Sequence, residues 1–373
     1  MDRRSYLRAL SAGIAGLAGC ATVVDTRTTR PRTTTPANQV AYRIETMTMN
    51  LQVPWGSAFQ PTTGDLYVTE RPGRVRKLKR TDGEFTGEKR TLVADLTDAV
   101  SQRGDGGLLG LAFHPNEPSV AFTFQTEATP DGPVNRVVRH DVTDGFSRHG
   151  VVVDDIPAGT HHNGGRLAFG PDGALFVTTG DAGTPTAAQN TDSLAGKVLR
   201  VLPDGDPHPD NPFGNAVFTY GHRNPQGLTF HPQTGEPYCT DRGPNVDEVN
   251  VLRTGHDYGW PNVMGRGTDT TDPLATFSPP VGPAGATFYD GSIEDWQGDL
   301  FVGTLSGTAL YRLTVDPRTS NVSDRQRLLS GEYGRLRSTF VGRTGNLYVT
   351  TSNRGGTGEP APQDDRILRI LPS

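Results

Sequence analysis

The sequence contains few cysteines, no excess of positive charge and no long apolar run. Of its 373 residues only 2 are cysteines, Cys20 and Cys239, which excludes a fold held together by several disulfide bonds. The formal net charge of -5 gives no reason to expect a nucleic-acid partner. The apolar stretch near the N-terminus is about ten residues long, which is too short for a membrane-spanning helix.

The N-terminus has the pattern of an export signal. It begins MDRRSYLRAL, with twin arginines at Arg3 and Arg4, and continues through apolar and small residues to Cys20. This order is typical of a twin-arginine signal, and LAGC resembles the lipobox of secreted lipoproteins. A short buried helix is the alternative. We expect residues 1–19 to be removed and Cys20 to be lipidated, which would anchor the protein at the outer face of the cytoplasmic membrane.

The next segment, residues 20–39, predicts a tether. It is rich in Thr, Arg and Pro and shows no apolar period, so it is expected to be a flexible connection between the anchor and a folded domain. With Cys20 lipidated, Cys239 has no partner for an intramolecular disulfide. Stability must then come from packing or from bound ions.

One sequence motif, called here the repeated phrase, recurs from residue 40 onward. The composition, with 46 Gly and 29 Pro, already favours turn-rich β structure over long helices. In the repeated phrase an apolar strand ends in Phe-x-Pro, a Gly turn follows, and a second strand such as LYVT or LFVT completes a hairpin. The last two copies lack the Phe-x-Pro but keep the second strand. Six phenylalanines mark the copies at intervals of 54, 56, 61, 58 and 52 residues: Phe59, Phe113, Phe169, Phe230, Phe288 and Phe340.

This period predicts an all-β fold, a six-bladed β-propeller of four-stranded antiparallel blades over residues 40–373. A β-sandwich with chance internal similarity is the alternative. We expect VAYRIETM near residue 40 and DRILRIL near the C-terminus to share one blade and close the ring, which leaves no free sheet edge. Loops from every blade of a propeller meet at one end of the central channel, so residues far apart in sequence can converge there.

Polar, Gly-rich loops adjoin the repeat strands. His162 in GTHHNGGRL is a candidate general base, because imidazole titrates near neutral pH and a Gly-rich loop lets a substrate approach closely. The alternative is a turn histidine bonded only to the backbone. We expect the neighbouring His161 to point to the other side of an extended chain, so that the two histidines do not ligate one metal together.

Other loops offer groups that suit an anionic ligand and a hard cation. Arg223 and Asn224 in GHRNPQG combine a fixed charge with an amide, a pair that suits an oxygen-rich anion; the alternative is an arginine that ties loops together. The turn at Gly243 and Pro244 can present backbone carbonyls, which Ca²⁺ accepts as ligands.

The segment RLR places Arg335 and Arg337 on one face of an expected strand. Two like charges on one strand face are often simply solvated. If that face lines the channel, however, the two arginines can clamp a dianion.

Taken together, these motifs resemble the soluble quinoprotein sugar dehydrogenases, the glucose/sorbosone dehydrogenase family that includes the aldose sugar dehydrogenases. The resemblance covers about residues 45–371. Its most specific parts are GGLLGLAFHP, HNGGRLAFGPDG, GHRNPQGLTFHP and GPNVDEVNVLRTGHDYGWPNV, which occur in the family's order. The family is a six-bladed propeller that binds pyrroloquinoline quinone (PQQ) and Ca²⁺ at the channel mouth.

The resemblance implies a role for each matching residue. His162 would be the base that removes the proton from the sugar C1 hydroxyl as hydride passes to C5 of the quinone, and Arg223 and Asn224 would contact the quinone oxygens. Arg335 and Arg337 would face the cofactor carboxylates.

The resemblance also implies metal ligands. The carbonyls of Gly243 and Pro244 would hold the Ca²⁺ beside the quinone. Glu248 and Tyr258 match positions that ligate a second, structural Ca²⁺, Tyr258 through its carbonyl, and Asp247 is the next candidate ligand.

The sequence departs from the family at three positions. We expect Asp105 to be one of the cofactor-binding residues. It stands just ahead of GGLLG, where the family usually has Gln or Glu near the substrate. The shorter acid can still bind a sugar hydroxyl. A cofactor-contacting Lys aligns with Ser306. An aromatic residue that stacks on the quinone aligns near Ser278, and the adjacent Phe277 is the alternative stacking partner.

Three functions follow from these observations. The leading one is a cell-surface oxidation of aldoses to lactones that passes electrons to a respiratory acceptor. The second is a non-catalytic propeller that binds a glycan or a protein, but such a protein has no need for the quinone and Ca²⁺ ligands. The third is a metal-dependent lactonase with His162 acting on water, which requires a carboxylate-rich metal centre that the loops do not obviously supply.

Overall fold

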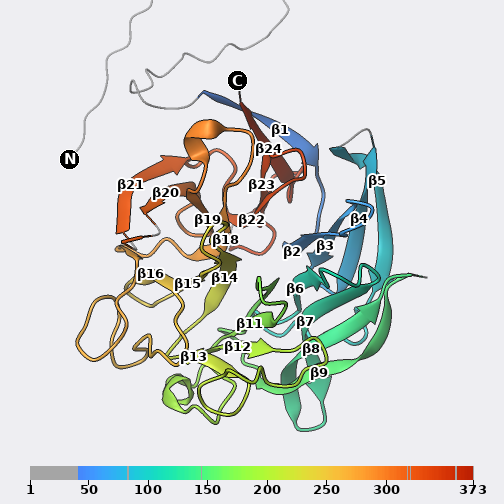
Figure 1. Ribbon diagram of the computed structural model, residues 1–373. Coiled ribbons are helices and arrows are strands. Elements are labelled where there is room, and N and C mark those ends of the chain that lie inside the picture. Colours follow the sequence, from blue (N-terminus) through green and yellow to red (C-terminus); the bar gives the residue numbers. More distant parts are fainter. Residues whose placement is uncertain are drawn as a thin grey trace, which may run out of the picture. The chain divides into compact units, whose positions relative to one another are not determined.

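A computed structural model describes residues 41–81, 84–143, 145–316, 318–319, 321–357 and 359–372, with only the backbone described for residues 84–89 (Figure 1). The expected signal (residues 1–19) and tether (residues 20–39) lie outside this part of the chain. The residues from Val40 onward form one compact unit. No helix in the described part is long and apolar enough to cross a membrane.

The described chain is a six-bladed β-propeller, as the repeat predicts. Its strands form six separate four-stranded antiparallel sheets, arranged around a centre (Figure 1). Blade 1 is β2–β5, blade 2 is β6–β9 and blade 3 is β10–β13. Their bounds are β2 Pro54–Phe59, β3 Leu66–Glu70, β4 Arg74–Thr81, β5 Glu84–Asp95, β6 Leu108–Phe113, β7 Val120–Thr129, β8 Gly132–Asp141, β9 Ser147–Pro157, β10 Gly164–Phe169, β11 Leu175–Thr179, β12 Lys197–Val201 and β13 Val217–Tyr220.

Blade 4 is β14–β17, blade 5 is β18–β21, and blade 6 combines β22–β24 with β1. In the described residues two short 3₁₀ helices lie in loops, η1 (Pro185–Gln189) in blade 3 and η2 (Glu294–Trp296) in blade 5. The remaining bounds are β14 Pro225–Phe230, β15 Pro237–Asp241, β16 Asp247–Val251, β17 Ala275–Phe277, β18 Pro283–Phe288, β19 Leu300–Thr304, β20 Leu310–Asp316, β21 Asn321–Leu328, β22 Leu336–Val341, β23 Leu347–Thr351, β24 Ile367–Pro372 and β1 Tyr42–Thr48.

The repeated phenylalanines mark the first strand of each blade. Each lies at the last or next-to-last residue of β2, β6, β10, β14, β18 or β22. These six strands contact one another in order around the centre, and β22 returns to β2. Phe59 and Phe340 meet across that last junction with ring centroids 5.8 Å apart. The repeated phenylalanines therefore mark the strands through which one blade packs against the next.

The ring closes as expected from the two ends of the domain. Strand β1 pairs antiparallel with β24, with Tyr42 opposite Pro372 and Ile44 opposite Ile370. Leu368 and Ile370 of β24 are buried in a core cluster with Trp296 and Leu336, and the partly buried Tyr42 and Ile44 of β1 pack against it. The shared blade leaves neither segment as an unpaired strand beside the ring.

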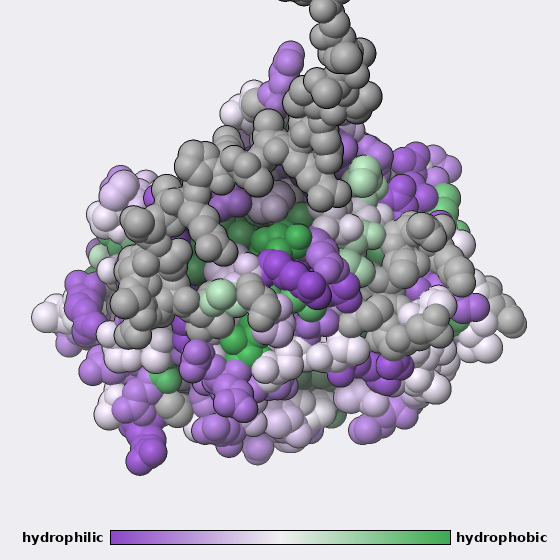
Figure 2. Space-filling model, turned by 90° about the horizontal axis from the view of Figure 1, so that it is seen from above, coloured by the Kyte–Doolittle hydropathy of each residue, from purple (hydrophilic) through white to green (hydrophobic). Residues whose placement is uncertain are grey.

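The antiparallel order places the site loops at one end of the propeller. In each blade the chain enters the first strand at the end where the second strand leaves. The loops before β10 and β14 and the turn between β15 and β16 therefore share an end. Within the described residues the exposed large apolar side chains are few, namely Met49, Leu92, Phe213 and Met264. Hydrophilic residues dominate the coloured surface of the side seen in Figure 2.

Candidate active site

His162 lies in the loop before β10 and is paired with a carboxylate. Its Nδ1 is 2.9 Å from Oδ1 of Asp181, the second residue after β11 in the same blade. The His162 side chain is 20% exposed, whereas that of Asp181 is 1% exposed. The backbone of His162 is left-handed, with φ of 61°, a conformation that costs about 1 kcal/mol in a residue with a Cβ. The fold therefore holds this imidazole in a specific orientation against a buried acid.

Asp181 is held ionised by its hydrogen bonds. Burial alone would raise its pKa, but donors from His162, Gly183 and Trp260 outweigh burial, so the pKa lies below its ordinary value. The Gly183 amide donates to Oδ1 at 2.8 Å and the indole Nε1 of Trp260 donates to Oδ2 at 2.8 Å. An ionised carboxylate only accepts hydrogen bonds, so the proton between the pair belongs to Nδ1 of His162. Its Nε2 is then left with a free lone pair.

Arg223 and Asn224 are fixed in the adjacent blade by Asp241 at the end of β15. The two carboxylate oxygens of Asp241 accept the backbone amides of Arg223 at 3.0 Å and Asn224 at 2.7 Å. Among the described residues, the buried Nε of Arg223 and Nδ2 of Asn224 have no hydrogen-bond partner. Two buried donors without acceptors are costly unless a ligand supplies oxygens.

The sequence predicts Arg335 and Arg337 on one face of a strand, but only Arg337 lies inside β22 and Arg335 immediately precedes it. Nε of Arg335 donates to the carbonyl of Ser352 at 3.2 Å, and Nε of Arg337 donates to the hydroxyl of the same residue at 3.1 Å. Burial lowers the pKa of Arg337 to about 9, and the neighbouring arginines act in the same direction. Burial also lowers the pKa of Arg335.

A third arginine, Arg166 on β10, joins this cationic cluster. Its guanidinium lies over the ring of Trp55, 4.3 Å from the centroid, and burial lowers its pKa to about 9. Within the described chain, Arg166 and Arg337 have no carboxylate partner in an ion pair, and the buried Nη2 of Arg166 and Nε of Arg71 lack acceptors. Cations held largely out of solvent without counter-ions fit an anionic ligand, because the anion would restore the charge balance.

Asp105 reaches the same region from the loop before β6. Its backbone amide donates to the carbonyl of Thr160, two residues before His162, at 2.9 Å. Its charge also partly offsets the effect of burial on the pKa of Arg335 and Arg337. The structure therefore brings Asp105, the His162 loop and the arginine cluster together.

The Gly243–Pro244 turn connects β15 to β16 and is tightly bent. A Cβ on Gly243 would lie 1.8 Å from the carbonyl oxygen of Val246, so only glycine fits. Asp247 braces the turn, because its Oδ1 accepts the Gly243 amide at 2.9 Å. Among the described residues, no hydrogen bond uses the carbonyl oxygens of Gly243, Pro244 or Tyr258. These oxygens remain available as ligands.

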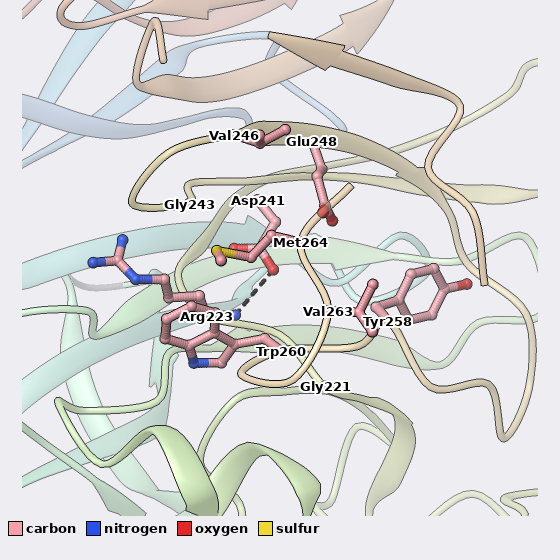
Figure 3. A pocket seen from close by; sticks show the side chains of 10 residues that line it. All are labelled: Gly221, Arg223, Asp241, Gly243, Val246, Glu248, Tyr258, Trp260, Val263 and Met264. Carbon is pink, nitrogen blue, oxygen red and sulfur yellow. Dashed lines mark hydrogen bonds between the residues drawn. The ribbon is translucent and has the colours of Figure 1, made fainter. Parts of the chain in front are cut away.

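A small cavity of about 10 Å³, the size of one water or ion, lies behind this turn (Figure 3). Glu248 points its carboxylate into the cavity, whereas the ring of Tyr258 points away from it (Figure 3). The Tyr258 hydroxyl donates to the Val251 carbonyl at 2.6 Å, so only the Tyr258 backbone could serve a metal. Burial, and then nearby Asp241, raise the pKa of Glu248 to about 7. A cation would relieve this crowding of negative charge.

The three departures in the sequence have different outcomes. Ser278 and Ser306 line one open pocket of about 550 Å³, which Arg325 and Arg327 also reach from β21. Phe277, the alternative stacking partner, lines the same pocket. Its side chain is 3% exposed in a core cluster, and Arg325 covers its ring at 4.5 Å from the centroid. Arg325 would have to move before a cofactor could stack on that face of the ring.

His161 and His162 were expected to point to opposite sides because the chain is extended there, and that reason is wrong. The two adjacent histidines do not follow an extended chain, because His162 is left-handed, and their ring centroids lie 6.2 Å apart. No group of three or more His, Cys, Asp or Glu side chains in the described residues could hold a metal. Cys239 is a free, buried thiol on β15.

Sequence reasoning missed Asp181, Asp241, Arg166 and Trp260. The two aspartates had a signal, because each closes or follows the buried second strand of a blade, LFVTTGD or PYCTD. Trp260 lies within the motif GPNVDEVNVLRTGHDYGWPNV, but nothing in the sequence connects it to Asp181, 79 positions away.

Comparison with known proteins agrees with this geometry. Residues 51–359 match the glucose/sorbosone dehydrogenase family. An oxidoreductase of Thermus thermophilus, described as a glucose dehydrogenase, is 42% identical with a TM-score of 0.81, over 89% of this chain and 100% of its own. The PQQ-bound aldose sugar dehydrogenase of Streptomyces coelicolor is 33% identical with a TM-score of 0.79, over 89% and 99%. Aldose sugar dehydrogenase YliI of Escherichia coli is 28% identical over 84% of this chain and 91% of its own.

These matches place the protein among the propeller-fold oxidoreductases of the quinoprotein type. More narrowly, the chain belongs to the glucose/sorbosone dehydrogenase family.

Proposed function

We propose that the protein oxidises aldose sugars at C1 to lactones, with PQQ and Ca²⁺ as cofactors. The observation that carries this proposal is the His162–Asp181 pair beside a cluster of buried cations and donors that lack partners. The PQQ-bound relative from Streptomyces coelicolor supports the choice of cofactor.

In this proposal His162 is the general base. Asp181 fixes the proton on Nδ1, so Nε2 can accept the proton of the sugar C1 hydroxyl and hold it as an imidazolium. The ionised Asp181 stabilises that positive charge. The left-handed loop and the buried carboxylate hold the ring still, so little reorganisation is needed when the proton moves.

The donor set fits PQQ, an anionic quinone that supplies a hydride acceptor when bound. Arg223 and Asn224 offer their unpartnered donors to its quinone oxygens, which favours negative charge there. Arg335 and Arg337 would bind its carboxylates, and Asp105 would contact cofactor or sugar hydroxyls. None of the three arginines needs to break an ion pair to a carboxylate in the described chain before it can bind an anion.

The carbonyls of Gly243 and Pro244 would hold Ca²⁺ beside the quinone, because they are free and belong to a braced turn. A second Ca²⁺ would occupy the cavity at Glu248, with the Tyr258 carbonyl as a further ligand and Asp247 nearby. The ion at the Gly243–Pro244 turn would draw electron density from the quinone oxygens.

We also propose that the electrons pass to a respiratory acceptor and that a lipid on Cys20 keeps the protein at the outer face of the cytoplasmic membrane. The sequence pattern before Cys20 supports this proposal. An intact-mass spectrum of protein from the membrane fraction should show a diacylglyceryl or triacyl addition on a chain that starts at Cys20. An unmodified Cys20 would exclude the anchor.

The test of the function is a calorimetric titration of EDTA-treated protein with PQQ, with and without Ca²⁺, followed by dye reduction with a panel of aldoses. We expect Ca²⁺-dependent binding and sugar-dependent dye reduction. The variant Arg335→Ala/Arg337→Ala should weaken PQQ binding by at least tenfold while His149→Gln, an exposed control, should not. Absence of PQQ binding to the wild type would reject the function and leave a propeller that acts as a binding module.

A further inference from the structure

Trp260 touches both halves of the candidate site. It lies in the segment after β16, far in sequence from the catalytic loop, yet its indole Nε1 donates to Oδ2 of Asp181 at 2.8 Å. The guanidinium of Arg223 lies over the same indole ring, 5.3 Å from its centroid. Asp181 and Arg223 also meet directly, because the Asp181 amide donates to the Arg223 carbonyl at 2.8 Å.

The indole N–H binds Oδ2 of Asp181, the oxygen that does not face His162, and so fixes the orientation of the carboxylate. Oδ1 already accepts hydrogen bonds from His162 and from the amide of Gly183. Without a donor on Oδ2 the carboxylate could rotate about its χ2 torsion, which is a soft two-fold torsion. A donor on each oxygen holds the plane of the group, and with it the direction in which Oδ1 faces the imidazole.

Trp260 is itself anchored to blade 3. Nε2 of Gln189, the last residue of η1, donates to the Trp260 carbonyl at 2.8 Å. The buried Nζ of Lys197 donates to the carbonyls of Ala187 and Ala188 in that same 3₁₀ helix, at 2.9 and 3.0 Å. The indole is therefore a rigid link, and the Asp181 loop and the Arg223 loop both rest on it.

We propose that Trp260 is a positioning residue that fixes Asp181 against His162 with its N–H and aligns Arg223 with its ring. The inference rests on the proposed role of His162 as base. It predicts that the two contacts can be separated, because phenylalanine keeps a ring under Arg223 but has no N–H for Asp181. His161 and the guanidinium of Arg223 also lie near the His162–Asp181 pair, and Asp241, Arg242 and Asp247 act on the charge of Arg223.

The first test is Trp260→Phe, examined by long-range proton–nitrogen NMR of histidine-labelled protein without cofactor. In the wild type His162 should be the Nδ1–H tautomer. In Trp260→Phe the Nε2–H tautomer, the commoner form in water, should appear in a measurable fraction. The matched control is Trp296→Phe in blade 5, whose indole is also buried and also lies under an arginine, Arg312, at 5.8 Å. It should leave the His162 signals unchanged.

The second readout is kinetic. In Trp260→Phe kcat should fall about tenfold, with KM for the sugar and affinity for PQQ within about twofold, because the ring under Arg223 remains. Trp260→Leu should also weaken PQQ binding, since it removes the ring. In an Asp181→Asn background the change from Trp260 to Phe should cost less than twofold. A structural role alone would lower the amount of folded enzyme and would not produce this split.

A folded Trp260→Phe protein with an unchanged His162 tautomer would overturn the proposal. If that variant does not fold, hydrogen exchange of the Trp260 indole N–H in the wild type and in Asp181→Ala decides. Exchange should be at least tenfold faster in Asp181→Ala, and equal rates would reject the hydrogen bond. These NMR measurements use protein without cofactor, so they remain informative even if the protein does not oxidise sugars.

Discussion

Blades 3 and 4 each contain a histidine paired with an aspartate at the same place in the repeat, yet the two pairs differ. His162 and Asp181 are 19 residues apart, as are His222 and Asp241. In both blades the histidine precedes the first strand and the aspartate closes or follows the second. The same His–Asp arrangement therefore occurs in two copies of the repeat.

The difference lies in what surrounds each imidazole. His222 is fully buried, stacks on Tyr258 with ring centroids 4.7 Å apart, and its Nε2 bonds to the Thr219 hydroxyl at 2.9 Å. His162 is partly exposed and, within the described residues, its Nε2 has no partner. One copy is a structural contact and the other is available for chemistry, so exposure and a free nitrogen distinguish a base from a scaffold.

The largest effect is expected from a substitution that removes the His162–Asp181 pair of blade 3. His162→Ala should lower turnover by about two to four orders of magnitude, because a positioned base contributes about that much. The thermal midpoint should stay close to that of the wild type, since the ring is partly exposed. Steady-state dye reduction and a melting curve measure both. Turnover within a few-fold of the wild type would show that His162 is not the base.

The matching change in blade 4 should act on stability instead. His222→Ala removes a fully buried ring from its stack and leaves the Thr219 hydroxyl without a partner, so it should cost about 3 kcal/mol of unfolding free energy. Turnover per folded molecule should change less than tenfold, because Asp241 still accepts the amides of Arg223 and Asn224. Denaturant unfolding measures the loss. A stability equal to that of the wild type would contradict the scaffold role.

The two aspartates sharpen the contrast further. Asp181→Asn should lower turnover by about 30-fold with PQQ affinity nearly unchanged, because an amide no longer holds the proton on Nδ1 of His162. Asp241→Asn should have the opposite profile and weaken PQQ binding, since it disturbs the backbone of Arg223 and Asn224. Titration calorimetry and dye reduction on both variants give the comparison. Equal losses in both quantities for both variants would mean that the two pairs do not have separate roles.

The sequence was sufficient to predict the propeller and much of the site. Blade number, ring closure and the shared end of the loops follow from a strand period and from the need to bury each blade against the next, and Phe59 and Phe340 show that contact directly. His162, Arg223 and Asn224 lie in Gly-rich loops next to repeat strands, which made them visible. The contacts of Trp260 and the burial of Phe277 could not be predicted, because they depend on through-space packing between segments with no common pattern.

A buried histidine without an aspartate partner tests what such a partner contributes. His140 on β8 is 1% exposed, bonds to the Thr123 hydroxyl at 2.8 Å, and has no carboxylate in hydrogen-bond contact within the described residues. Burial lowers its pKa to about 3, and the nearby charge of Arg148 acts in the same direction. Between the ordinary value of 6.5 and about 3, the unfolded chain therefore binds a proton that the folded chain excludes.

Stability should accordingly fall as the pH is lowered below 6.5, by up to about 1.4 kcal/mol per pH unit from this residue alone. His140→Gln removes the titrating group, so its unfolding free energy should decline less steeply than that of the wild type between pH 6 and about 4.5 in denaturant titrations. The exposed His149 of the same blade is the control, and His149→Gln should follow the wild-type curve. Parallel curves for His140→Gln and the wild type would mean that this histidine accepts its proton in the folded state, and that burial without an aspartate does not keep an imidazole neutral here.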